Sequence, residues 1–268
     1  MNRKLLNSKM IVVLAVTLVL FMTTGVAEEE RTDASGQWEY YLVDGGAMIT
    51  GYLEESSGDL VIPSELDGYT VTVIYSMVSQ WREMTYWECD GLTSLTIPDS
   101  VTNIDIWNPF KGSSLSYIHV ADNNPVYIGI DGVLYQKQGS ILLAYPGGRE
   151  GGFVIPEGVS AIGDYAFSRC SGLASVAIPN SVSAIGDWAF EDCTGLTVVT
   201  IPDSVISIGF RAFGDCSSLT SISIQDSVTS IDMGAFTGCE KLTLSVTKGS
   251  YAEQYAKENN IPYVFSTE

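Results

Sequence analysis

The sequence predicts a solenoid, in which short coils stack on one another with a parallel β-sheet along one side. One phrase recurs every 23 residues, as GVSAIGDYAFSRC, SVSAIGDWAFEDC and SVISIGFRAFGDC. These copies begin at Gly158, Ser181 and Ser204. The apolar residues keep the same place in each copy, and 46% of the 268 residues are hydrophobic. A chain of this size and composition is able to bury a large shared core.

Several apolar positions follow the same register through four copies. Isoleucine, valine, phenylalanine, cysteine and leucine recur at the positions of Ile155, Val159, Phe167, Cys170 and Leu173. A period between 20 and 29 residues with recurring leucine and isoleucine indicates a leucine-rich repeat, in which each copy forms one coil. A single coil is too small to bury these side chains alone, so coils have to stack.

Two of these positions define the predicted interior. One column contains Phe167, Phe190, Phe213 and Phe236, and the next contains Cys170, Cys193, Cys216 and Cys239. We expect the cysteines to be buried free thiols, because free cysteine is among the most buried residue types. Disulfides between coils and a metal thiolate site remain alternatives, although structural zinc sites favour closely spaced cysteine pairs and none occurs here.

The segment from Leu173 to Ile178 alternates toward its end and is predicted to be the strand that each coil contributes to the parallel sheet. Proline follows the strand in most copies, which suits a strand terminus. We expect about six coils in one right-handed array: degenerate repeats at 61–120 and regular 23-residue repeats at 154–244.

The remaining segments are assigned by their local patterns. Residues 1–27 have a basic start, a short apolar run and small residues before Ala27, which is typical of a secretory signal peptide. An uncleaved membrane anchor is the alternative. Residues 28–60 are predicted to form an N-terminal β cap, and 121–153 an inserted hairpin with its turn at Gln136 to Gly139.

Residues 245–268 are predicted to cap the last coil with a helix and a strand. Ser250 is a suitable helix N-cap, and Glu253 three residues later completes a capping box. Tyr251 and Tyr255 lie one helical turn apart, and both are expected to cover the last coil. Residues 261–265 are expected to add an edge strand.

The charge limits the partners. The formal net charge is −19, and removal of the basic residues Arg3, Lys4 and Lys9 with the signal peptide makes it about −22. Such a surface repels phosphate backbones, so nucleic acid and anionic membranes are poor partners. No membrane insertion is expected after signal cleavage, no motif calls for a cofactor or metal, and the oligomeric state is left open.

The repeat resembles the BspA-type leucine-rich repeat of bacterial surface and secreted proteins. The resemblance rests on the run I-P-x-S-V-x-x-I-G-x-x-A-F-x-x-C-x-x-L and covers about residues 37 to 265. The copies beginning at Ile62 and Ile97 depart from it. The resemblance implies a mostly β leucine-rich repeat solenoid, a secreted or extracellular-surface location, and a role in adhesion or the binding of proteins.

The sequence contains little that points to catalytic chemistry. His119 is the only histidine, and its register places it on the outward face of the predicted sheet. A Ser-His-Asp site needs a nucleophile and an orienting acid beside the histidine, and no motif supplies them. Tyr117 and His119 are the large groups on a ledge of small hydroxyl residues, which predicts a ligand contact there. An incidental surface position is the alternative.

A second candidate contact is the stretch WREMTYWECD. It contains Trp81, Arg82, Tyr86 and Trp87, which are residue types enriched in binding hot spots. The same aromatic residues would also serve to fill a gap between poorly matched coils.

The function that the sequence favours is non-catalytic recognition of a protein, a glycan or another cell surface outside the cell. The first alternative is a secreted hydrolase with a site near residues 81–110, which would need two facing carboxylates. The second is a structural module that self-assembles through strand edges at the ends of the array.

Overall fold

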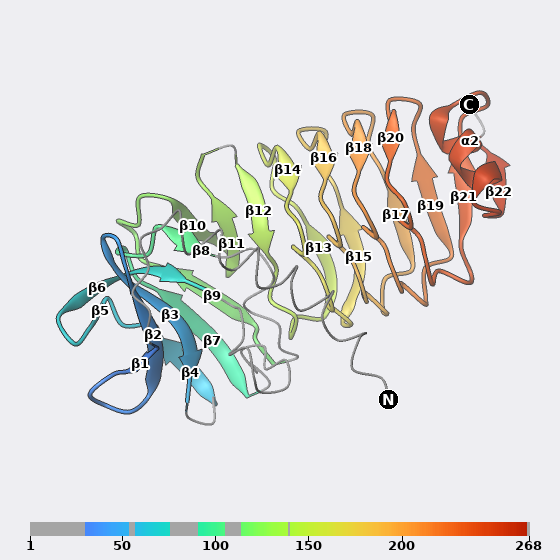
Figure 1. Cartoon of the computed structure of the whole chain (residues 1–268). Coiled ribbons are helices and arrows are strands. Elements are labelled where there is room, and N and C mark those ends of the chain that lie inside the picture. Colours follow the sequence, from blue (N-terminus) through green and yellow to red (C-terminus); the bar gives the residue numbers. More distant parts are fainter. Residues whose placement is uncertain (1–29, 54–56, 76–90, 105–113, 139, 267–268) are drawn as a thin grey trace, which may run out of the picture.

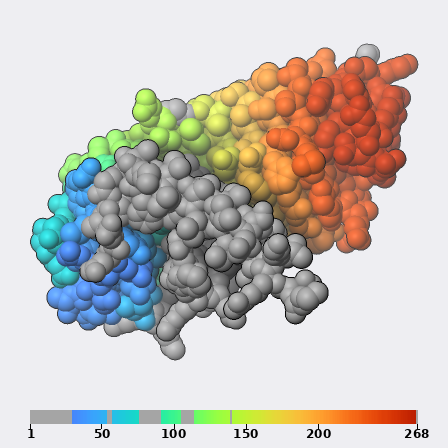
Figure 2. Space-filling model, viewed as in Figure 1, coloured from blue at the N-terminus to red at the C-terminus, as the bar shows by residue number. Residues whose placement is uncertain are grey.

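The computed structural model describes residues 30–53, 57–75, 91–104, 114–138 and 140–266. The predicted signal peptide therefore lies outside the described residues. The chain forms a mostly β solenoid of about eight turns, more than the six coils expected from the sequence. Figure 1 shows the turns in chain order along one axis, and Figure 2 shows the regular coils as one continuous elongated body.

The regular coils are held together by two sets of parallel strands. The long-strand sheet consists of β13 (Gly151–Val154), β15 (Leu173–Ala177), β17 (Val198–Thr200), β19 (Ser221–Ile224), β21 (Thr243–Val246) and β22 (Tyr263–Phe265). The short-strand ladder consists of β12 (Ile141–Ala144), β14 (Ala161–Ile162), β16 (Ala184–Ile185), β18 (Ser207–Ile208) and β20 (Ser230–Ile231). Each regular coil thus adds a second, two-residue strand to the one that the sequence predicts.

The first coils repeat this plan. Their long-strand sheet contains β4 (Gly58–Val61), β7 (Leu92–Ile97) and β9 (Tyr117–Val120). Their ladder contains the parallel strands β3 (Gly46–Tyr52), β6 (Tyr69–Ile74) and β8 (Asn103–Ile104), with β1 (Arg31–Thr32), β2 (Trp38–Val43) and β5 (Glu65–Leu66) added antiparallel. Part of the predicted N-terminal cap therefore belongs to the solenoid itself.

A small antiparallel unit lies between the two halves. It consists of β10 (Tyr127–Ile130), β11 (Val133–Gln136) and β12, so the expected hairpin has a third strand. The turn between β11 and β12 lies where the sequence places it, although Gly139 is outside the described residues. On β11, Leu134 packs into the core of the first half while Val133 and Tyr135 pack into that of the second. The unit therefore serves both cores.

The two halves begin in the same way. Antiparallel strands β2 and β3 start the first ladder, and β11 and β12 start the second. Each of these strand pairs is followed by a long strand whose last residue, Val61 or Val154, begins a Val-Ile-Pro triplet. Both valines are strongly exposed, at 62% and 73%. We conclude that each half of the solenoid is started by its own hairpin.

The phenylalanine column is confirmed. Phe167 and Phe190 stack with centroids 4.7 Å apart, Phe190 and Phe213 with centroids 5.0 Å apart, and Phe213 and Phe236 with centroids 5.7 Å apart. All four side chains are buried. Because each ring covers its neighbour, the coils share one dry interior.

The cysteine column is confirmed as a ladder of free thiols, although Cys239 is only partly buried. Three thiols donate to the phenylalanine carbonyl one coil earlier: Cys193 to Phe167, Cys216 to Phe190 and Cys239 to Phe213, at 2.9–3.1 Å. Burial raises the pKa of Cys170 and of Cys193. The fifth cysteine, Cys89, lies outside the described residues.

The bend between each short strand and the next long strand uses left-handed backbone. Tyr165, Trp188 and Arg211 have φ between 48° and 57°, and the last coil has Gly234 at this position. Arg169, Asp192 and Asp215 are left-handed four residues later, where the last coil has Gly238. Bulky side chains at positive φ are unusual, yet three of these bends place tyrosine, tryptophan or arginine there.

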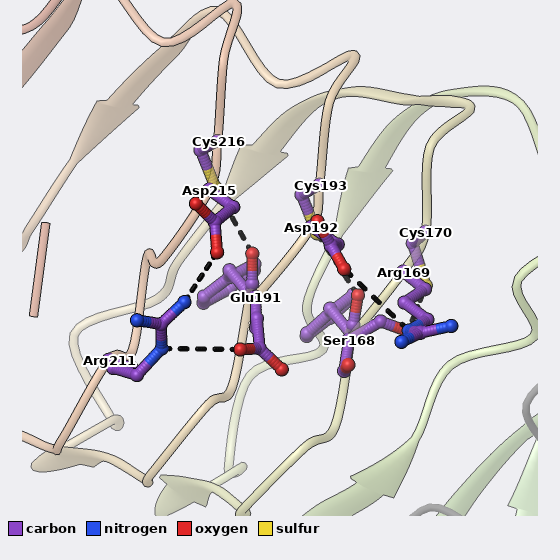
Figure 3. A network of polar contacts seen from close by, with 11 residues as sticks. Ser168, Arg169, Cys170, Glu191, Asp192, Cys193, Arg211, Asp215 and Cys216 are labelled. Atoms are coloured by element: carbon purple, nitrogen blue, oxygen red, sulfur yellow. Dashed lines mark hydrogen bonds and ion pairs between the residues drawn. The ribbon is translucent and has the colours of Figure 1, made fainter. Parts of the chain in front are cut away.

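Ion pairs link these bends on the outside of the cysteine ladder (Figure 3). Arg169 contacts Asp192 of the next coil, with 3.6 Å between Nε and Oδ2. Arg211 contacts both Glu191, at 3.3 Å, and Asp215. The second arginine is the less exposed of the two, so its pairs are the less screened by solvent.

The C-terminal cap contains helix α2 (Tyr251–Glu258) and strand β22. The Ser250 hydroxyl accepts a hydrogen bond from the Glu253 backbone amide, as predicted. The Glu253 carboxylate accepts one from the Gly249 amide, whereas a capping box would use the amide of Ser250 itself. Tyr255 is buried with its ring 5.9 Å from Phe236. Tyr251 is 42% exposed, so the prediction that it covers the last coil is wrong: it occupies the first helical position, on the solvent side.

Among the described residues, no helix combines the length and apolar character needed to cross a membrane.

Candidate recognition surface

The outward face of the long-strand sheet is almost uncharged along the regular coils. One column of paired residues contains Gly152, Ser175, Val198, Ser221 and Thr243, and beside it Thr200, Ser223, Ser245 and Val264 are paired in turn. Residues of this kind suit a strand and keep the face hydrated. The alternation places leucine, isoleucine and valine inward, so this face presents a shallow neutral surface.

The same face in the first coils contains larger and charged groups. Asp59 of β4 is opposite Ser94 of β7, which is opposite Tyr117 of β9. Thr96 is opposite His119 in the neighbouring column. Tyr117 and His119 are both exposed, as the sequence predicts, because Ile118 between them points into the core with no exposed area.

Tyr117 and His119 form a close, tilted ring pair. Their ring centroids are 4.3 Å apart and the ring planes are inclined by 37°. Tyr117 also lies on Gly132, in the turn between β10 and β11: a Cβ at Gly132 would be 2.6 Å from the Tyr117 Cδ2 atom. The Tyr117 ring therefore rests between a histidine and a bare backbone, which fixes its position on the surface.

Asp59 places a carboxylate beside this ring pair, and it is not among the contact residues predicted from the sequence. Its Oδ1 atom accepts hydrogen bonds from the Ser94 hydroxyl at 2.6 Å and the Thr93 hydroxyl at 3.2 Å. The hydrogen bonds from Ser94 and Thr93, with a smaller contribution from the charge of His119, lower the pKa of Asp59. The signal was available, because counting back from the Ile62-Pro63 pair places Asp59 in register with Ser94 and Tyr117.

The second predicted contact cannot be placed. Trp81, Arg82, Tyr86 and Trp87 all lie within residues 76–90, outside the described residues. The hydrolase hypothesis concerns residues 81–110, of which only 91–104 are described; that part is the strand β7, its following turn and β8.

The described residues contain no cluster of three or more histidine, cysteine, aspartate or glutamate side chains that could hold a metal ion. A shallow depression of about 300 Å³ lies beside the start of α2, lined by Asp226, Lys248 and Tyr251 among others. It is remote in the fold from Tyr117 and His119, at the opposite end of the array (Figure 1).

Comparison with known proteins identifies the repeat. A family described as "BspA type Leucine rich repeat region" matches residues 70–130 and 151–258 in six copies. The chain belongs to this family. No curated protein matches it.

One of the solved structures that the chain resembles supports the fold. A leucine-rich repeat protein from Eubacterium ventriosum is 21% identical, with a TM-score of 0.56 over 82% of this chain and 79% of that chain. The pneumococcal vaccine antigen PcpA is 16% identical, covering 90% of this chain and 99% of that one with a TM-score of 0.47. A leucine-rich cell surface protein from Faecalibacterium prausnitzii is 19% identical, covering 86% and 97% with a TM-score of 0.44. At this identity the likeness to the Eubacterium ventriosum protein shows the fold alone.

Proposed function

We propose that this BspA-type protein is a secreted or surface-held bacterial binding protein, which recognises a protein or a glycan without catalysing a reaction. One observation carries the proposal. The tilted ring pair Tyr117 and His119, with the Asp59 carboxylate beside it, stands on a sheet face whose other outward residues are mostly small. We call these three residues the recognition cluster.

The three side chains of the cluster are held in place by their neighbours, which favours binding without a conformational change. Ile118 is fully buried beneath it, and Gly132 supports the Tyr117 ring. The Asp59 carboxylate is already oriented by two hydroxyl donors. A preorganised surface loses little conformational entropy when a partner docks. Tyrosine also supplies both apolar area and a polar hydroxyl, as in many binding hot spots.

The hydrogen bonds support a non-catalytic role. In a Ser-His-Asp site the acid orients the histidine, which in turn activates the serine. Here the Ser94 hydroxyl donates directly to Asp59, and no hydrogen bond joins His119 to either residue within the described part of the chain. The arrangement therefore lacks the relay that a hydrolase of this type needs.

Leucine-rich repeat proteins generally bind other proteins, and BspA-type members are typically found at the bacterial surface or secreted. The strongly negative charge agrees with an extracellular role and disfavours nucleic acid. We infer the same location for this chain, with residues 1–27 acting as a cleaved signal peptide.

The test is affinity capture from host extracellular proteins and from a glycan array. Wild type is compared with a Tyr117→Ala/His119→Ala variant and with a Thr200→Ala/Ser223→Ala control on the outward face of the second half's long-strand sheet. We expect a partner that wild type and the control retain and the cluster variant loses. Equal capture by all three proteins would refute the cluster as the site. A Trp81→Ala/Trp87→Ala variant then tests the second predicted contact.

The affinity change is directly measurable once a partner is found. Loss of a Tyr-centred contact typically weakens binding by about 2 kcal/mol or more when it is a hot spot, which is roughly a thirtyfold rise in Kd. A partner that contacts His119 should also shift its imidazole NMR signal. That signal is easy to identify, because His119 is the only histidine in the chain.

Self-association is a second candidate function, which the end of the long-strand sheet favours. Strand β22 pairs with β21 on one side, and its residues Val264 and Phe265 are 54% and 47% exposed. An open strand edge with apolar side chains is a template for pairing with another chain. Light scattering that shows a monomer at high concentration would exclude this candidate.

A further inference from the structure

A second surface lies on the bends between the short and long strands of the regular coils. Tyr165 and Trp188 stack there with centroids 4.9 Å apart and planes 7° apart, and Phe210 meets Trp188 edge-on at 5.0 Å. Met233, one repeat after Phe210, is 72% exposed. Together with Asp164 and Asp187, these residues form what we call the bend surface.

The backbone does not explain these aromatic residues. Tyr165 and Trp188 have φ of 57° and 51°, a region that costs a residue with a side chain about 1–2 kcal/mol. Ring stacking contributes about 0.5–1.5 kcal/mol beyond the area it buries. The two terms are of similar size, and Gly234 builds the same bend without a side chain. The fold therefore does not require a ring at these positions.

Carboxylates stand beside the rings. Asp164 and Asp187 directly precede Tyr165 and Trp188 in the sequence. The Asp164 carboxylate accepts a hydrogen bond from the backbone amide of Asp187 in the next coil, at 2.8 Å. The Asp187 carboxylate in turn accepts one from the backbone amide of Phe210, at 2.7 Å. Among the described residues, neither aspartate forms an ion pair with lysine or arginine, whereas Arg169 and Arg211 are both engaged.

The geometry points to a second binding site on the bend surface, for a protein segment in which lysine or arginine alternates with apolar side chains. Unpaired carboxylates attract ammonium and guanidinium groups, and neighbouring aromatic rings add cation–π attraction. Phe210 and Met233 supply apolar area farther along the same surface. A basic, partly apolar segment is complementary to both properties and to the net charge of −19.

This site is independent of the recognition cluster. The bend surface follows β14, β16 and β18 of the short-strand ladder, whereas Tyr117 and His119 belong to the long-strand sheet of the first half. Substitutions in one therefore leave the other intact, and either proposal is able to fail alone.

The test uses the full mature chain and a fluorescently labelled peptide of alternating lysine and leucine, with a glutamate–leucine peptide as its charge control. Fluorescence anisotropy gives the Kd at low and at moderate salt. We expect the basic peptide to bind and the acidic one not to bind. Asp164→Asn/Asp187→Asn keeps an oxygen for the amide hydrogen bonds, and should weaken binding roughly tenfold, since each exposed charge contact changes Kd a few-fold.

The matched control is Asp203→Asn/Asp226→Asn, which removes the same charge from exposed positions outside the bend surface. It should change Kd less than about twofold. Trp188→Gly removes the ring at a backbone conformation that glycine adopts freely, so it should weaken binding while circular dichroism shows an intact fold.

Three results would overturn the proposal. The first is equal binding of the basic and acidic peptides, and the second is equal weakening by the two aspartate pairs, which would show that only overall charge matters. The third is binding of neutral chitooligosaccharides that depends on Trp188 while the basic peptide does not bind, which would make the bend surface a glycan site instead.

Discussion

The thiol of Cys193 donates a 3.0 Å hydrogen bond to the carbonyl oxygen of Phe167, which belongs to the preceding coil. The bond joins the cysteine column to the phenylalanine column, and the same contact recurs in the next two coils. Cysteine thus fills space as a small apolar side chain and also gives the buried Phe167 carbonyl a second donor beside the Cys170 amide, which alanine would not supply. This double role explains why the residue recurs at a fixed interval.

The phenylalanine column predicts a large loss of stability for Phe190→Ala. Phe190 is fully buried between two stacked rings, and removal of such a ring costs about 3–5 kcal/mol. For a chain of this size the melting temperature should fall by roughly 6–20 °C. Phe265→Ala, at a 47% exposed position, is the control and should shift it little. A fall of only a degree or two for Phe190→Ala would contradict the stacked interior.

The thiol ladder predicts selective reactivity. Cys170, Cys193 and Cys216 are buried, whereas Cys239 in the last regular coil is partly exposed. The contact between the Cys216 and Cys239 thiols, together with burial, raises the pKa of Cys216, and the same contact lowers the pKa of Cys239. In a Cys89→Ser background, a thiol reagent at pH 8 should modify Cys239 in the native chain and the other three only after unfolding. Mass spectrometry that finds Cys193 modified as fast as Cys239 would disprove this.

The repeated interior could be predicted because self-similarity makes it visible. Phe167, Phe190 and their equivalents recur every 23 residues, and so does the environment into which they point. The short strands at Ala161–Ile162 and its equivalents were missed because two residues are too few to show an alternating pattern. The number of turns was underestimated because the first strand of each half, ending at Val61 and Val154, follows a hairpin instead of another coil.

Outward positions were harder to predict. His119 was placed correctly from its register with Ile118, but Asp59 was overlooked because a single exposed aspartate in an acidic chain has no distinguishing pattern. Trp188 is not predicted to face outward, because in the sequence it directly precedes the repeated core residues Ala189 and Phe190. Its outward orientation follows from a left-handed φ, which the sequence indicates only through the glycine at position 234 of the last coil.

The C-terminal cap predicts a pH dependence. The ion pair with Lys257 and the hydrogen bond from the Gly249 amide lower the pKa of Glu253 from 4.5, and the partner Glu253 raises the pKa of Lys257 from 10.5. The Glu253 contribution is present above pH 4.5 and is lost as the pH falls through its lowered pKa. The Lys257 contribution is present below pH 10.5 and is lost above its raised pKa.

Hydrogen exchange of the α2 amides tests this window. Protection of Ala252 to Ala256 should decrease below pH 4.5 in wild type relative to the amides of β19. In Glu253→Gln that extra decrease should disappear, because the substitution removes the titrating group. An identical acid profile in the two proteins would show that another group controls the fraying of α2.

The left-handed bends predict that, at one position, a glycine variant is more stable than an alanine variant. At Trp188, with φ of 51°, glycine should be more stable than alanine by about 1 kcal/mol because alanine retains the strain. Val198, within strand β17, should show the opposite order, since glycine weakens a strand. Thermal melts of the four variants are sufficient. Alanine more stable than glycine at both positions would mean that position 188 does not adopt the left-handed backbone.

The support of Tyr117 by Gly132 predicts a signal at His119. Alanine at position 132 places a Cβ 2.6 Å from the Tyr117 ring, which forces the ring to move away from His119. Gly158→Ala is the matched control: its φ is +89°, close to the +75° of Gly132, but nothing lies within 4 Å of the added Cβ. Both variants should lose about 1–2 kcal/mol of stability from the strained φ, and only Gly132→Ala should disturb the recognition cluster.

The chain contains one histidine, so an untagged sample gives a single imidazole signal that needs no assignment. The imidazole lies with its centroid 4.3 Å from that of Tyr117, so it experiences the ring current of the tyrosine. Tyr117→Ala should move the signal, Gly132→Ala should move it in the same direction, and Gly158→Ala should leave it in place. If Gly132→Ala leaves the signal unmoved while Tyr117→Ala shifts it, the ring does not depend on the bare backbone at Gly132, and the rigidity on which the recognition cluster rests would have to come from elsewhere.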